Sequence, residues 1–232
     1  MRRTRLSAVM IGATIVVLGG CSQGDDKRTP EQPRPAAVGT GGAGANLNSD
    51  GEFVHDVAIK NMAAIELSRI ALEKATSPEI RSFAQLIIGG HAVAGDKLKS
   101  AVSGHAIDWP AQLDDQYRKT ADQLGKKHGG DFDRDYVAAM VESHEDLAAK
   151  LESRLDVQSL ADWKTAAAAR TQSRMMPDPK VEMGDVKVRP NQSDDEITTK
   201  INQWAAETYP VAQKHLDTAR TLENPTKKRS TN

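Results

Sequence analysis

A sequence pattern occurs twice in this chain, at an offset of 53 residues, and both copies have the spacing of an amphipathic helix. Phe83 aligns with Tyr136, and His91 aligns with His144. The other matched pairs are Ile87 with Met140, Ile88 with Val141, Lys97 with Lys150, Leu98 with Leu151 and Ser100 with Ser153. Repeated amphipathic helices of this length predict helical hairpins, from which four-helix bundles are commonly built.

Cap and breaker residues predict six helical segments. The clearest start is Ser77-Pro78-Glu79, which offers an N-cap serine, a proline at the first helical position and an acid near the positive end of the dipole. The expected helices span residues 50–75, 77–102, 110–127, 131–155, 160–174 and 194–223. We therefore expect an all-α fold, a four-helix up-and-down bundle with additional short helices.

Composition excludes several classes of protein. Aromatic residues make up only 4% of the chain, which is poor material for a β-sandwich. A net charge of −1 offers no basic face for nucleic acid, so we expect no nucleic-acid partner. The single cysteine rules out an internal disulfide and every multi-cysteine metal motif.

The first 20 residues have the pattern of a secretory signal peptide, with three arginines followed by a short apolar stretch. Leu18-Gly19-Gly20-Cys21 resembles the bacterial lipobox, in which the cysteine is acylated after cleavage. Several acyl chains give stable membrane anchoring. Ser22 follows where an Asp would retain many lipoproteins at the inner membrane, so the pattern points to the outer membrane, facing the periplasm.

Domain boundaries follow from composition. Residues 21–49 are rich in Pro, Gly and polar residues without periodicity, and they predict a disordered tether. The folded domain is expected to span residues 50–224, and residues 225–232 to form a disordered tail. Inside that domain, residues 177–193 contain three prolines and predict a long loop.

Three histidines lie near the middle of apolar helix faces. His91, His144 and His215 each fall on a stripe of apolar residues with helical spacing, so each should point into the core. His91 and His144 lie about 20 Å from the starts of their helices, whereas His215 lies about 12 Å from its predicted helix end. The level of His215 is therefore expected to match less well.

Three inward imidazoles indicate one transition-metal site, because imidazole is the commonest side-chain ligand of such ions. Glu66, on the first helix at comparable depth, is the candidate fourth ligand. The alternative is that each histidine is a core residue bonded to a neighbouring polar group, and the sequence leaves both interpretations open.

The positions three residues before these histidines are Ile88, Val141 and Ala212. Di-iron bundles instead carry Glu-x-x-His on two helices, with further glutamates on the others. The sequence thus argues against a di-iron centre and favours a single ion such as Zn, Cu or Ni.

Short stretches across the helical region form a further pattern. They are Asp50–Val54, Ala64–Leu67, Ala71, Glu73–Ala75, Phe83-Ala84, His91, Phe132–Tyr136, Met140-Val141, His144, Tyr209-Pro210, His215-Leu216 and Ala219. They resemble the bacterial "domain of unknown function 4142" family of exported helical proteins. The resemblance implies a ferritin-like bundle and an envelope location, and it supplies no activity. The family pattern usually places Asp immediately before the first two histidines, where this chain has Gly90 and Ser143. Relative to that pattern, residues 159–193 resemble an insertion.

Three functions remain open at this stage. One is a membrane-anchored envelope lipoprotein that binds a metal or small ligand through the inward histidines. The second is a structural lipoprotein that interacts with envelope proteins and binds no ligand. The third, a redox enzyme, has less support, because the sequence contains no nucleophile–base pair and no phosphate-binding loop.

Overall fold

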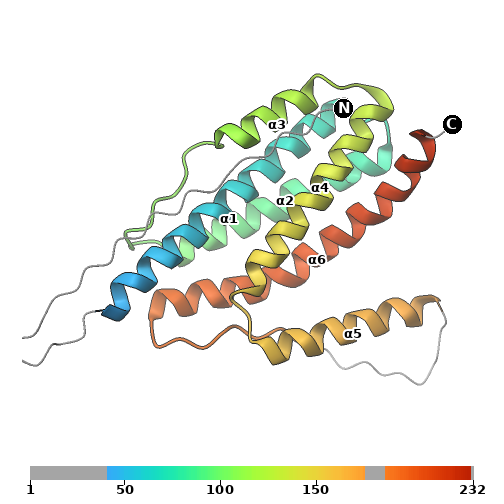
Figure 1. Ribbon diagram of the computed structural model, residues 1–232. Coiled ribbons are helices and arrows are strands. Elements are labelled where there is room, and N and C mark those ends of the chain that lie inside the picture. The colour runs from blue at the N-terminus through green and yellow to red at the C-terminus, as the bar shows by residue number, and fades with distance from the viewer. Residues whose placement is uncertain (1–40, 176–185, 231–232) are drawn as a thin grey trace, which may run out of the picture. The chain divides into compact units, whose positions relative to one another are not determined.

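The computed structural model describes residues 41–175 and 186–230, and these residues are helical apart from their connecting segments (Figure 1). Six helices are present in these ranges: α1 Gly41–Lys74, α2 Pro78–Ala101, α3 Asp115–Gly125, α4 Gly129–Glu152, α5 Val157–Met175 and α6 Glu196–Ser230. The only β pairing among them is an isolated bridge between Leu155 and Pro190. The all-α prediction is confirmed.

The start of α2 agrees with the predicted cap, whereas α3 begins at Asp115 instead of residue 110 and α4 at Gly129 instead of residue 131. The Ser77 hydroxyl accepts a hydrogen bond from the backbone N–H of Ile80 at 3.3 Å, and Pro78 is the first residue of α2. The Asp114 carboxylate accepts from Tyr117 N–H at 2.8 Å and so caps α3. Both caps satisfy backbone donors that the first turn leaves unpaired.

Two helices extend beyond the range predicted for the folded domain. The tether was expected to extend to residue 49, but α1 begins at Gly41, and the tail expected from residue 225 is helical to Ser230. Extending an existing helix adds one backbone hydrogen bond per residue at no new nucleation cost, so a packed helix can propagate beyond its apolar stripe. The predicted signal peptide, Cys21 and the rest of the tether lie outside the described residues.

Four helices, α1, α2, α4 and α6, pack against one another, and α3 lies on α1 and α4. The predicted up-and-down order is wrong, because α2 and α4 run parallel. Phe83 contacts Tyr136 near the two helix starts, and His91 meets His144 farther along. The connection that contains α3 carries the chain back along the helices, which allows this parallel pairing (Figure 1).

The directions of the other helices follow from contacts at their ends. The end of α1 meets the start of α4, where Thr76 N–H donates to the Asp133 carboxylate at 2.9 Å. The start of α1 meets the start of α6, where the Thr198 hydroxyl donates to Asp50 at 2.6 Å. Consequently α1 and α6 are parallel to each other and antiparallel to α2 and α4.

The apolar core has two parts. One part is formed by buried residues in the first halves of α1 and α6, among them Phe53, Trp204 and Tyr209. The other surrounds the start of α2 and α4, including Phe83 and Phe132. On α1, α2, α4 and α6 a short stretch of residues separates the two parts of the core. His91, His144 and His215 lie in that stretch on α2, α4 and α6.

Helix α5 lies at the edge of this core. Its Trp163 ring packs edge-on against Tyr209 at 5.2 Å between ring centroids, and Lys164 pairs with Glu152 at 2.8 Å. It occupies the first part of the predicted insertion, residues 159–193, of which residues 176–185 lie outside the described residues. None of the described helices has the length and apolar character needed to cross a membrane.

Asp133 is expected to be the most important polar side chain at the α1–α2 turn. It is 3% exposed and accepts hydrogen bonds from Thr76 N–H, the Thr76 hydroxyl and Ser77 N–H. Replacing it with Ala should lower the free energy of unfolding by about 2–3 kcal/mol, because buried donors lose their partner. Urea denaturation measures this change.

Asp131 provides the matched control for Asp133. Its side chain is 74% exposed and pairs with Arg134 on the surface. Asp131→Ala should change the free energy of unfolding by no more than about 0.5–1 kcal/mol. Equal effects of the two substitutions would contradict the role assigned to Asp133.

Candidate metal centre

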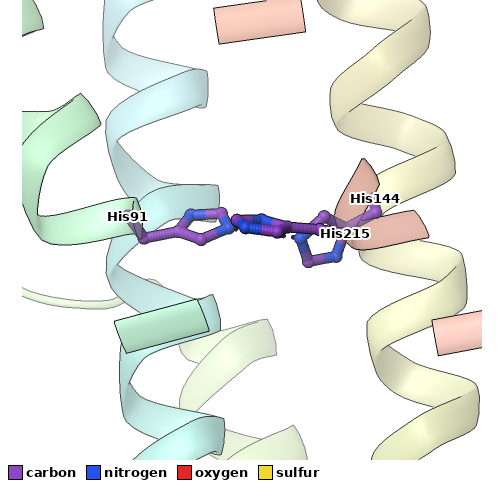
Figure 2. A group of neighbouring side chains, drawn as sticks. All are labelled: His91, His144 and His215. Atoms are coloured by element: carbon purple, nitrogen blue, oxygen red, sulfur yellow. Dashed lines mark hydrogen bonds between the residues drawn. The ribbon is translucent and has the colours of Figure 1, made fainter. Parts of the chain in front are cut away.

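The structure brings three of the predicted site residues together. His91 on α2, His144 on α4 and His215 on α6 point toward one another across the core (Figure 2). His91 Nε2 lies 3.2 Å from His144 Nε2, and one ligand nitrogen from each ring lies within 4.8 Å of the others. Each residue is at most 5% exposed, so the cluster is buried.

The three rings share one level, which the sequence predicted only for His91 and His144 and only if their helices run parallel. His215 was placed near the end of its helix because that helix was expected to stop at residue 223. In the structure α6 extends to Ser230, so His215 lies 15 residues before the end of an antiparallel helix. His144 lies 15 residues after the start of α4, and the two depths therefore coincide.

Glu66, the predicted fourth ligand, does not join the cluster. Its side chain is 42% exposed and pairs with Arg69 one turn away, at 3.5 Å. The apolar neighbours Ile65 and Leu67 suggested an inward position, but adjacent residues on a helix point in different directions. Among the described residues, the group of potential ligands around this point contains no carboxylate.

The hydrogen bond of His144 Nδ1, the ring nitrogen that faces away from the cluster, determines which nitrogen of that ring carries the proton. His144 Nδ1 lies 2.8 Å from the backbone carbonyl oxygen of Met140, one turn earlier on α4. A carbonyl oxygen can only accept, so Nδ1 carries the proton and donates it. Nε2 of the neutral ring is then an unprotonated acceptor that faces the centre of the cluster.

His91 has the same arrangement on α2. Its Nδ1 lies 2.9 Å from Asn61 Oδ1, an amide oxygen that likewise only accepts. With the proton on Nδ1, His91 Nε2 is also an acceptor. Two nitrogen lone pairs thus face each other at 3.2 Å, an arrangement that is unfavourable unless a cation lies between them.

His215 completes the group without an outer partner. Its Nδ1 is buried and has no hydrogen-bond partner among the described residues. A buried polar atom normally finds a partner, because leaving it unpaired costs about 1–3 kcal/mol. This nitrogen is therefore available to a ligand.

Burial keeps the imidazoles neutral. Desolvation holds the pKa of His91 well below its usual value, and the nearby His144 and His215 rings lower it further. Desolvation also lowers the pKa of His144, against a hydrogen bond to Met140 that raises it. The pKa of His215 falls to about 4, mainly through burial. Neutral imidazole is the form that binds metal ions.

A cavity of about 20 Å³ adjoins the cluster. It lies between α1, α2, α4 and α6, and His91 and His215 form part of its wall. Its other lining residues are Val57, Asn61, Gly90, Ala94, Leu147, Trp204, Thr208, Val211 and Ala212. None of these side chains carries a formal charge, and the volume is sufficient for one water molecule.

Asn61 is the site residue that sequence reasoning missed. It lies on α1 between Val57 and Ala64, which belong to the two separate parts of the core. The available signal was a single polar residue within an apolar stripe of helical spacing. The other histidines, His55, His105 and His128, do not belong to the cluster.

The family model described as Domain of unknown function (DUF4142) matches residues 35–176, more than half of the chain. The chain belongs to the DUF4142 family. This membership confirms the resemblance inferred from sequence, and the matched region includes His91 and His144 while His215 lies beyond it. Neither a search of curated proteins nor a search of solved structures finds a match.

Gly90 provides a test of how closely α2 and α6 approach. A Cβ atom at Gly90 would lie 2.9 Å from His215 Cε1, whereas one at Gly89 would meet nothing within 4 Å. Gly90→Ala should therefore displace the His215 ring from its buried position. Because the displaced ring is better solvated, its pKa should rise from about 4 toward the ordinary value near 6.5, measured by NMR titration of the imidazole.

Gly89→Ala is the control, since it adds the same methyl group to open space. It should leave the His215 pKa unchanged and stabilise the helix by about 0.5–1 kcal/mol. A His215 pKa that is the same in both variants would contradict the close approach of Gly90.

Proposed function

We propose that this DUF4142 protein binds one transition-metal ion through His91, His144 and His215. The observation that carries the proposal is the pair of acceptor nitrogens facing each other at 3.2 Å. Two ligand nitrogens of a tetrahedral ion with bonds of about 2.0–2.1 Å lie about 3.3 Å apart, so this separation suits a shared ion. His215 supplies the third ring nitrogen, which lies within 4.8 Å of the other two.

The outer partners support the same interpretation. Metal-binding histidines usually donate their second N–H to a carbonyl or carboxylate, which fixes the ring and increases its basicity. The Met140 carbonyl and the Asn61 amide oxygen provide this contact for His144 and His91. Three neutral nitrogen ligands suit Zn, Cu or Ni better than Mg, Ca or Mn.

The structural alternative is a core of histidines without a ligand. It requires His91 Nε2 to donate to His144 Nε2, which makes His91 Nδ1 an acceptor. That nitrogen would then need a donor, which Asn61 provides once its amide is turned so that Nδ2 faces His91. The ligand-free arrangement therefore satisfies His91 and His144 but leaves the buried His215 Nδ1 without a partner among the described residues.

The helix arrangement supports a ferritin-like class for the domain. Ferritin-like bundles have one long crossover connection, and the connection through α3 between the parallel helices α2 and α4 fits that topology. Their di-iron centres depend on bridging carboxylates, which the described ligand group lacks. We therefore propose a ferritin-like scaffold with a mononuclear nitrogen site.

Metal analysis of purified protein tests this function. The full-length chain incubated with Zn²⁺ and desalted should retain about one ion per chain, because three fixed imidazoles form one site. The triple variant His91→Ala, His144→Ala, His215→Ala should retain none. His105→Ala removes an exposed histidine outside the cluster and should retain the ion.

Equal metal content in the triple variant and the native chain would refute the proposed site. Circular dichroism of each variant verifies that helix content is preserved. A native chain that retains no ion would favour the structural alternative.

We also propose that Cys21 anchors the protein in the bacterial envelope. The support is sequence alone: an N-terminal apolar segment that ends in Leu18-Gly19-Gly20-Cys21, followed by a polar linker. The helical domain would then face the periplasm, tethered to the outer membrane.

Cys21→Ser tests this anchor, because serine cannot receive the thioether-linked lipid. The native chain, expressed in a bacterium with two membranes, should fractionate with the outer membrane and incorporate labelled palmitate. The variant should incorporate none. Palmitate incorporation at a similar level in both would rule out lipidation at Cys21.

A further inference from the structure

The described residues of the histidine cluster provide no negative charge to balance a bound metal ion. The three imidazoles are neutral ligands, and the described residues around them provide no carboxylate within the ligand group. A divalent ion bound there would keep its full double positive charge. Placing an uncompensated charge among buried apolar side chains is costly, so the site requires an anion from solution.

Coordination leads to the same requirement. Three histidines occupy three positions of a tetrahedral ion, and the fourth remains open to an exogenous ligand. No fourth ligand-bearing side chain belongs to the cluster in the described part of the chain, and Glu66 points elsewhere. The open position must therefore face space in which a ligand fits.

The cavity beside His91 and His215 is that space. About 20 Å³ of it is open to the centre of a water-sized group, which admits an ion of one to three atoms and is too small for an aromatic ring. Its wall is mainly apolar, formed by Ala94 on α2, Thr208 and Ala212 on α6, and neighbouring side chains. Such a wall provides no competing charge.

We propose that this cavity holds a fourth, exchangeable metal ligand, and that the ligand is a small inorganic monoanion such as chloride or azide. The inference rests on the proposed metal function and adds the class of ligand that the site takes. One negative charge halves the excess positive charge, and the cavity volume sets the upper limit on the size of the anion.

Cobalt(II) is the probe for this test, because a four-coordinate cobalt ion absorbs strongly in the visible region and its bands shift when a ligand is exchanged. The full-length chain carrying Cys21→Ser, purified in detergent, removes the thiol as a competing ligand. Azide titrated into the cobalt-loaded protein should shift the bands with one azide per cobalt. Benzoate, which is too large for the cavity, should leave them unchanged.

Ala94→Leu fills the cavity from α2, and it should weaken azide binding by at least about tenfold while cobalt remains bound. Ala92→Leu is the matched control, since Ala92 is exposed on the same helix, and it should bind azide like the parent chain. If Ala94→Leu fails to bind cobalt, Thr208→Leu fills the same cavity from α6 and is judged by the same criterion.

The outcomes separate the two proposals. Cobalt bands that do not respond to azide would overturn the anion site and leave metal binding intact. The absence of cobalt bands from the parent chain would overturn the metal site, and the anion site with it. An equal response to azide in the filled and parent cavities, or a clear response to benzoate, would overturn the assignment of the ligand to this cavity.

Discussion

The contact between His91 Nε2 and His144 Nε2 is the constraint on which the rest of the site depends. Each ring donates its outer N–H to an oxygen, His144 to the Met140 carbonyl and His91 to the Asn61 amide. The carbonyl can only accept, and the amide holds the His91 proton on Nδ1 as long as its oxygen faces that ring. The two inner nitrogens are therefore acceptors 3.2 Å apart. The packed helices hold this pair in place, and a bound cation would convert a repulsive contact into two favourable ones.

Helix topology, more than composition, creates this contact. The repeat offset of 53 residues in the sequence equals the offset at which α2 and α4 pair, since Phe83 meets Tyr136 and His91 meets His144. Equivalent positions of a repeat can lie side by side at one level only when the two helices are parallel. The connection through α3 makes them parallel, and the antiparallel α6 then adds His215 at the same depth.

The sequence predicted the helices and the inward direction of the three histidines, because helical periodicity determines which face a residue occupies. It did not predict the helix order, since the direction of α4 depends on how the long connection runs and no periodic pattern encodes that. Glu66 was misplaced because apolar neighbours do not determine the direction of a side chain. Asn61 was missed because one polar residue in an apolar stripe has several structural explanations. The depth of His215 was underestimated because the end of α6 has no apolar stripe to mark it.

Two glycines of α2 lie against side chains of neighbouring helices. A Cβ atom at Gly90 would approach His215, and one at Gly95 would lie 2.7 Å from Asn61 Nδ2, so both partners occupy space that a side chain would need. The position of Gly90 must stay without a side chain for His215 to keep its place, and the hydrogen bond that orients His91 comes from Asn61 on α1.

The use of an amide instead of a carboxylate as the partner of His91 has an electrostatic consequence. An amide orients the His91 ring as well as a carboxylate does, but it contributes no negative charge to a bound ion. Each glycine also costs about 1 kcal/mol of helix stability relative to alanine, a cost that serves only the close approach of α2 to its neighbours. The arrangement that lets three imidazoles meet therefore contains no carboxylate within the described ligand group, and the small cavity beside them is where we place the anion that would balance a bound ion.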